Sequence, residues 1–129
     1  MEHPNLDTVQ ALLGGFVIGD ADRLRAGFAP DIRLESSGFD RTAGTYEGPD
    51  AVIGYFFAGD HMDDYRLEVI DMLASDERVA IVGRTFGRRG ERTIENDFVQ
   101  VLRLVDGLVT EIRIFAWDQK ALYEFRDAA

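Results

Sequence analysis

The sequence predicts an α+β domain in which three N-terminal helices and a short C-terminal helix wrap a curved antiparallel sheet. Apolar residues at helical spacing recur from residue 6 to about residue 59, with one strand-like segment among them. Four strand-like segments joined by short turns follow from residue 65. The last two meet at Asp106-Gly107, a dipeptide suited to a tight hairpin turn. Long strands interrupted by glycines need to curve, so we expect sheet and helices to enclose a cone-shaped interior.

The first two helices follow from apolar spacing and from turn residues. The first covers about residues 6–17, and Asp7 with Gln10 three residues later resembles a capping box. Gly19-Asp20 is expected to end this helix and to cap a short second one, which Pro30 stops.

Two further helices flank the long strands. One begins at Pro49, a residue favoured at the first helical position, and ends near Gly59. The last follows Trp117, with Leu122 and Phe125 on its apolar side and Asp118 placed as its N-cap.

Alternation of apolar and polar residues predicts the strands. We expect a loop over residues 37–48, after the first strand, and a turn over residues 87–90. The five strands are expected at about residues 32–36, 65–74, 79–86, 94–105 and 108–116.

Composition bounds the function. The 129 residues indicate one domain spanning residues 1–129, and the absence of cysteine excludes disulfides and thiolate chemistry. A net charge of −10 argues against nucleic-acid phosphates as a partner. There is no basic-then-apolar leader and no apolar run long enough to cross a membrane, so we expect a cytoplasmic protein without membrane association. No phosphate-binding or dinucleotide-binding motif occurs, so we expect no cofactor.

Three segments carry a resemblance to a known family. They are G-D-A-D-R-L-R-A-G-F-A-P-D-I at 19–32, Y-E-G-P-D-A-V-I-G-Y-F-F at 46–57 and L-R-L-V-D-G-L-V-T-E-I at 102–112. In this order they resemble the NTF2-like superfamily, in particular its SnoaL-like branch of polyketide cyclases and ketosteroid-isomerase-like proteins. The resemblance implies the NTF2-like cone fold over almost the whole chain. This fold carries enzymes as well as non-catalytic members, so fold alone does not assign an activity.

The catalytic residues of ketosteroid isomerases do not transfer to this chain. The family would need a tyrosine, an aspartate base and an aspartate oxyanion donor where this sequence has Phe16, Ser36 and Gln100. None of these can abstract a proton from carbon, which argues against steroid isomerase chemistry. The SnoaL-like branch carries an aspartate at the end of its last strand, and Asp118 lies near that place, with Trp117 as the alternative occupant.

Asp118 is the candidate catalytic acid or base. If it lies in an apolar mouth beside Trp117, desolvation raises its pKa toward neutrality. The alternative is that Asp118 caps the last helix, with its carboxylate bonded to a backbone N–H near Ala121. The sequence leaves both interpretations open.

The candidate ligand-binding residues are mostly on the penultimate strand. Asn96, Phe98, Gln100 and Leu102 are two apart and therefore share one face. We expect Gln100 to bind a ligand carbonyl or a water, whereas Asn96 is more typical of a structural hydrogen bond. Trp117 and Ser36 complete the expected wall.

Two other residue types are considered for the site. Tyr46 offers a hydroxyl, as do Tyr55 and Tyr65, although packing is their more common role. His61, in an acidic loop, can transfer protons if the loop covers the cavity mouth, and otherwise lies in solvent. One histidine with scattered aspartates does not make a zinc site, so we expect no metal.

The sequence therefore predicts a protein that binds a small, largely apolar organic molecule, with a cofactor-free cyclisation, isomerisation or dehydration as the possible reaction. A non-catalytic ligand-binding protein and a dimerising scaffold with a vestigial pocket are the alternatives. We also expect a homodimer, because Val99, Val101, Leu108 and Thr110 fall on the outer face of the hairpin if its register is simple.

Overall fold

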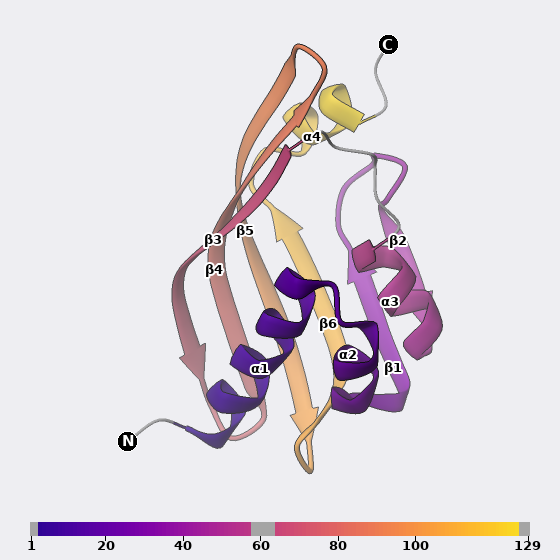
Figure 1. The fold of residues 1–129 in the computed structure, drawn as a ribbon, viewed down its shortest axis with the longest axis vertical. Coiled ribbons are helices and arrows are strands. Elements are labelled where there is room, and N and C mark those ends of the chain that lie inside the picture. The colour runs from indigo at the N-terminus through magenta and orange to yellow at the C-terminus, as the bar shows by residue number, and fades with distance from the viewer. Residues whose placement is uncertain (1–2, 58–63, 127–129) are drawn as a thin grey trace.

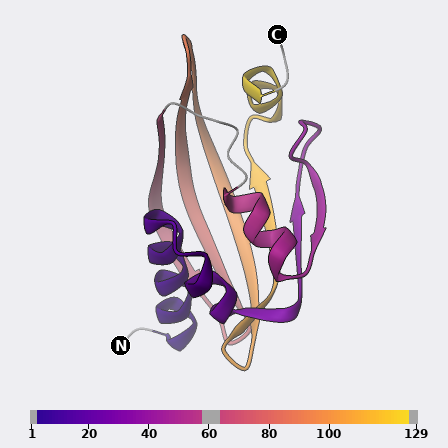
Figure 2. The ribbon, with the colours of Figure 1, turned by 45° about the vertical axis from the view of Figure 1, so that its right-hand side comes forward.

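The computed structural model describes residues 3–57 and 64–126, which form a strongly curved sheet with helices packed on its concave side (Figures 1 and 2). In chain order the elements are α1 (Pro4–Ile18), α2 (Ala21–Gly27), β1 (Phe28–Ser36), β2 (Gly44–Glu47), α3 (Pro49–Phe57), β3 (Asp64–Ala74), β4 (Arg78–Arg89), β5 (Arg92–Val105), β6 (Leu108–Ala116) and α4 (Gln119–Arg126). None of the described helices has the length and apolar character that a membrane crossing requires.

The strands form one sheet in the order β2-β1-β6-β5-β4-β3. Every neighbouring pair is antiparallel, as predicted, except β1 and β6, which are parallel. The chain returns to β1 only after β2, α3 and the β3–β6 meander, and the two strands are thus not joined by a hairpin. The predicted order of helices and long strands is confirmed.

Two boundaries in the first half differ from the prediction. Residues 44–47 form an edge strand, β2, inside the expected loop; it is short and mostly exposed, so it carries no alternation that the sequence could reveal. Strand β1 begins at Phe28 and runs through Pro30, because its pairing with β6 is irregular between Phe28 and Arg33 and needs no N–H from the proline.

The helix starts were partly predicted. Helix α1 begins at Pro4 with His3 as its cap, whose ring nitrogen Nδ1 accepts from the Asn5 N–H at 3.1 Å, so the capping box at Asp7 was wrong. The junction at Gly19-Asp20 is confirmed: Gly19 has φ 74°, and the Asp20 carboxylate accepts from the backbone of α2. Helix α3 begins at Pro49 as expected, and its predicted end near Gly59 lies outside the described residues.

The β5–β6 hairpin turns at Asp106-Gly107, where both residues have positive φ, 51° and 79°. This confirms the predicted tight turn. The register then shifts after Arg103, which leaves Thr110 as an extra residue on β6. The β4–β5 turn lies at residues 90–91, beyond the predicted residues 87–90, because β4 continues to Arg89.

The curvature of the sheet has a local cause in β3 and β4. The register shifts between Val69 and Asp71 of β3, a bulge that increases twist and bending. Opposite the bulge is Gly83 of β4, and the ring of Phe98 from β5 lies over it: a Cβ on Gly83 would be 2.5 Å from Phe98 Cζ. The bulge and the glycine together allow the sheet to bend around its interior.

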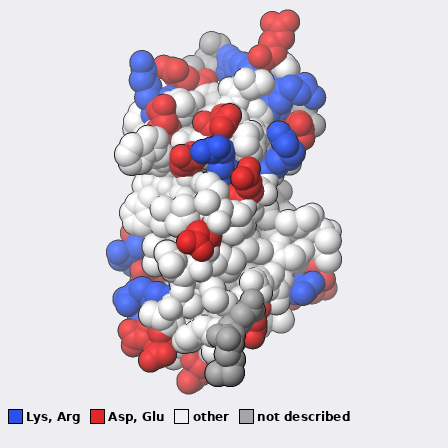
Figure 3. Space-filling model, turned by 90° about the vertical axis from the view of Figure 1, so that its left-hand side faces the viewer, with Lys and Arg blue, Asp and Glu red and all other residues white. Residues whose placement is uncertain are grey.

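The convex face of the sheet carries an apolar surface. Figure 3 shows a broad, mostly uncharged area between charged ends, with an acidic side chain within it. Val82, Val99 and Phe115 are side by side across β4, β5 and β6. With Ile70 and Trp117 they surround a shallow hollow, and we call these five residues the outer apolar patch. The register shift places Phe115 and Trp117 in the patch where the sequence pointed to Leu108 and Thr110.

We propose that a second copy of this chain covers the outer apolar patch. Of the charged groups beside it, Arg84 is paired within the chain, since it contacts Asp97 at 2.7 Å and Glu95 at 3.4 Å. This pairing reduces the repulsion between two such surfaces, although the net charge is −10 and Asp71 lies beside Val82.

Light scattering at micromolar concentration is expected to give twice the 14.5 kDa chain mass. Phe115→Glu should yield a folded monomer, because it places a charge in the apolar contact. Val105→Glu, at an exposed apolar residue outside the patch, is the matched control and should leave the dimer intact. A monomeric wild type would contradict the proposal.

Candidate functional site

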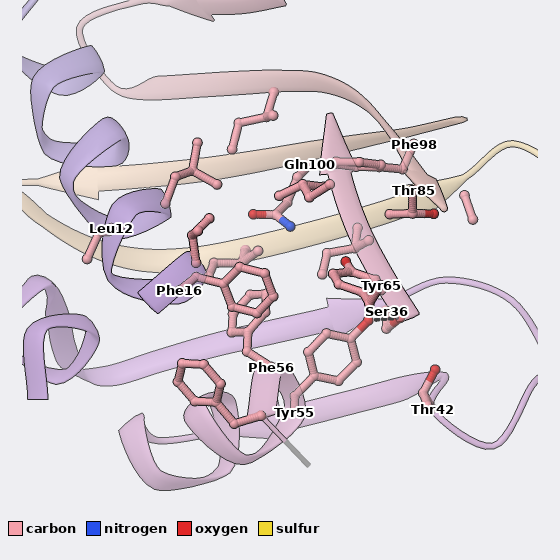
Figure 4. Close-up of a pocket in the computed structure, with 18 of the residues that line it drawn as sticks. Leu12, Phe16, Ser36, Thr42, Tyr55, Phe56, Tyr65, Thr85, Phe98 and Gln100 are labelled. Carbon is pink, nitrogen blue, oxygen red and sulfur yellow. Dashed lines mark hydrogen bonds between the residues drawn. The ribbon is translucent and has the colours of Figure 1, made fainter. Parts of the chain in front are cut away.

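A cavity of about 1160 Å³ lies between the concave face of the sheet and the helices (Figure 4). Ligand pockets usually range from about 300 to 1,000 Å³, so this one can take a molecule of several rings. Elements distant in sequence line it, from α1 and α3 through β5 and β6 to α4. The interior of the cone is thus hollow and not filled by the core.

One end of the cavity is apolar and aromatic. Leu12 and Phe16 reach it from α1, and Phe56 and Phe57 from α3. The Phe16 ring is stacked on Phe57, with centroids 5.6 Å apart, and meets Phe56 edge-on at 5.8 Å. Such a wall binds apolar ligand surface through burial and ring contacts and offers little polarity.

The other end carries hydroxyl groups. Ser36 ends β1 and its Oγ is 3.0 Å from the Tyr55 hydroxyl of α3 (Figure 4). Thr42 and Tyr65 line the cavity on the same side in the close-up. Burial raises the pKa of Tyr55, against an opposing effect of its bond to Ser36. Tyr55 is therefore protonated at neutral pH and can donate to a ligand oxygen.

Gln100 lies between the two ends, on the inward face of β5 with Phe98 and Leu102. Its amide is directed into the cavity in Figure 4. No hydrogen bond joins this amide to the described part of the chain, whereas Phe98 and Leu102 belong to the buried core. The expected positions of these three residues and of Ser36 on the wall thus agree with the structure, and their role in binding stays a prediction.

Asn96 borders the cavity but has a structural role. It is 4% exposed, its Nδ2 donates to the Asp118 carbonyl at 3.0 Å, and its Oδ1 accepts from the Asp118 N–H at 3.0 Å. Both halves of the amide are hydrogen-bonded to the backbone of one residue, Asp118. The structural interpretation of Asn96 therefore holds, and the amide ties the end of β6 to β5.

The structure places Asp118 and Trp117 away from the cavity wall. The Asp118 carboxylate accepts from the Ala121 N–H at 2.9 Å, so the residue caps α4, and its side chain is exposed. Trp117 is 85% exposed and belongs to the outer apolar patch. Both expectations for the wall were wrong, because the chain leaves the sheet at Ala116 and turns outward there.

Of the two remaining candidates, Tyr46 does not line the described wall. Tyr46 packs on Tyr55, with centroids 4.9 Å apart, and donates its hydroxyl to the Thr42 carbonyl at 2.8 Å. Tyr46 therefore packs against the Tyr55 ring without lining the cavity itself. His61 lies outside the described residues. Among residues 3–57 and 64–126, no group of three or more potential ligands forms a metal site.

The sequence reasoning missed several polar residues of the wall, among them Thr42 and Arg126. Thr42 comes from the segment expected to be a loop, and Arg126 from the last turn of α4. Neither belongs to an alternating strand pattern. Only the packing of α4 against the β1–β2 connection brings them to the same end of the cavity.

Comparison with known proteins identifies the family. Residues 9–112 match the model of the SnoaL-like domain. An NTF2-like protein from Burkholderia xenovorans is similar in structure, with a TM-score of 0.84 and 28% identity over 96% of both chains. Bal32a, from a soil-derived mobile gene cassette, has a TM-score of 0.88 and 25% identity over 95% of this chain and 96% of its own. No functionally curated protein matches the sequence significantly.

A more distant structure comes from Catenulispora acidiphila. It is described as a hypothetical protein with a ketosteroid isomerase-like fold in complex with trimethylamine, with a TM-score of 0.76 and 14% identity over 95% of this chain and 93% of its own. At that identity the likeness concerns the fold alone. These comparisons confirm the predicted NTF2-like fold.

Proposed function

The chain belongs to the SnoaL-like domain family, and we propose that its cavity binds a small, largely apolar organic molecule bearing oxygen substituents. The observation that carries the proposal is the Gln100 amide, which enters a large apolar cavity without a hydrogen bond to the described chain. Gln100 is half-buried, and a polar group that is shielded from water without a hydrogen-bond partner costs up to about 1–3 kcal/mol. A ligand oxygen or a water molecule in the cavity would supply the Gln100 amide with a hydrogen-bond partner.

The two ends of the cavity support the same ligand class. The aromatic end takes apolar surface, and the hydroxyl end, with Ser36 and Tyr55 hydrogen-bonded to each other, takes an oxygen substituent. Few directed polar groups in an apolar cavity are typical of small-molecule sites. The cavity volume also argues against a scaffold with a vestigial pocket, which would have a filled cone.

Acid–base catalysis is the second candidate function, and the buried Tyr55 hydroxyl favours it. A protonated phenol can stabilise the oxyanion that develops when a carbonyl compound isomerises, cyclises or loses water. The wall carboxylates among the described residues, Glu68 and Asp97, are exposed, and Asp97 accepts from Arg84 at 2.7 Å. The described wall thus offers a proton donor without a buried carboxylate base, and we place ligand binding first.

Binding of Prodan, a neutral naphthalene ketone dye, tests the proposal. Gln100→Leu should weaken Prodan binding about fivefold, the equivalent of one hydrogen bond of about 1 kcal/mol. The free energy of unfolding should stay unchanged or rise, because the replaced amide has no partner in the described chain. Native mass spectrometry of the purified protein can show a co-purified ligand directly.

The matched control is Gln10→Leu, the same substitution at an exposed position of α1. It should leave both binding and stability within experimental scatter. Destabilisation of Gln100→Leu by 1 kcal/mol or more with Prodan binding intact would show a core amide and contradict the proposal.

A further inference from the structure

The hydroxyl end of the cavity contains a positive charge in an otherwise acidic protein. Arg126, in the last turn of α4, lines the cavity and its side chain is 18% exposed. Its Nη1 donates to Thr42 Oγ1 at 2.7 Å, which fixes the guanidinium beside the β1–β2 connection. The other arginine on the described wall, Arg66, is exposed and stacks over Phe86 at 4.7 Å.

A buried carboxylate lies behind this guanidinium. Asp40 Oδ1 is 4.0 Å from Arg126 Nη1, at the limit of an ion pair, and accepts from the Thr42 N–H at 2.7 Å and from the Thr42 hydroxyl. Asp40 Oδ2 is buried with no hydrogen-bond partner within the described structure. Because Asp40 does not line the cavity and Arg126 does, the cavity faces the cation and not the anion.

A second arginine adds to the positive charge at this end. Arg89 Nη1 donates to the Arg126 carbonyl at 3.4 Å, and its guanidinium lies 5.7 Å from the centre of the Phe125 ring. The charge of Arg126 also reaches the cavity interior: burial raises the pKa of Tyr55, and Arg126 acts on it in the opposite direction.

We propose that the Arg126 end of the cavity is a subsite for an acidic oxygen group of the ligand, which makes the ligand an organic anion with an apolar body. The proposal rests on the proposed binding function and adds the charge of the ligand. A guanidinium presents several donors in one plane, and its attraction to an anion is strengthened where water is excluded. The hydroxyl of Tyr55 can donate to the same oxygen. The Thr42 hydroxyl donates to Asp40 and accepts from Arg126, so Asp40 holds the arginine through Thr42.

Two fluorescent probes with the same apolar core separate the two proposals. Anilinonaphthalene sulfonate carries an anionic group that the neutral N-phenylnaphthylamine lacks. Arg126→Gln should weaken sulfonate binding about tenfold or more and change neutral-probe binding less than about twofold, since only the former loses a charge-assisted contact. The matched control is Arg78→Gln, which alters an exposed arginine paired with Glu77 and should change neither probe.

Arg126→Gln leaves the buried Asp40 carboxylate without its cation, which lowers the stability of the variant. A second variant therefore separates the effect on folding from the effect on binding. Asp40→Asn with Arg126→Gln removes both charges and should show the same selective loss of sulfonate binding. Asp40→Asn alone should tighten sulfonate binding, because it removes a negative charge 4.0 Å from the Arg126 guanidinium. Equal weakening of both probes in the double variant, or unchanged sulfonate binding, would overturn the subsite. Failure of the wild type to bind the neutral probe would overturn the cavity function and the subsite with it.

Discussion

Gly83→Val is expected to lower the free energy of unfolding by about 2–3 kcal/mol or more, as overpacked sites do. A Cβ at this position would be 2.5 Å from Phe98 Cζ and 2.8 Å from the Glu68 carbonyl oxygen. The ring can move, but the carbonyl belongs to the backbone of the neighbouring strand β3. The strain therefore opposes the bend of the sheet that encloses the cavity. Urea unfolding of the wild type and the variant measures the difference.

Gly54→Ala is the control for this substitution. Gly54 lies within α3, and a Cβ there meets nothing within 4 Å, so the change should stabilise the protein by up to about 1 kcal/mol through helix propensity. Combining Gly83→Val with Phe98→Leu should restore part of the lost stability, because it relieves the ring contact and leaves the backbone contact. Equal stability of Gly83→Val and the wild type would show that β3 and β4 separate without cost.

Asn96→Ala should destabilise the protein by about 2–4 kcal/mol, because two hydrogen bonds are lost and a part-buried peptide group is left without its partners. The affected group is the N–H and carbonyl of Asp118, at the junction of β6 with α4. Since α4 carries Leu122 and Arg126 to the cavity wall, probe binding should fall with stability. Thermal unfolding together with a fluorescence titration tests both effects.

Two substitutions at Asp118 distinguish the stability contributed by the Asn96 hydrogen bonds from that contributed by the cap of α4. Asp118→Asn should have little effect, because asparagine caps helices about as well as aspartate. Asp118→Ala should cost about 1 kcal/mol, the usual value of a lost cap. A smaller loss for Asn96→Ala than for Asp118→Ala would contradict the role assigned to the Asn96 amide.

Alternation along a strand predicted the direction of some of the expected site residues and not of others. Within β5 the spacing of two places Phe98, Gln100 and Leu102 on one face, and the core needs that face inside. At the end of β6 the same reasoning fails for Asp118 and Trp117. There the direction of a side chain depends on where the chain leaves the sheet, and Asn96 of another strand holds that point.

Local sequence determined the helices and the long strands of this protein, but not the edge strand β2. Apolar periodicity, the Gly19-Asp20 junction and the Asp106-Gly107 turn act over a few residues, so the order of the helices and the long strands could be predicted. Tertiary structure decided the parallel β1–β6 pair and the polar end of the cavity. Thr42 and Arg126 are 84 residues apart in sequence and meet only when α4 packs beside the β1–β2 connection. No local sequence pattern predicts such a contact, because the two side chains meet only after the helices and strands have formed and packed.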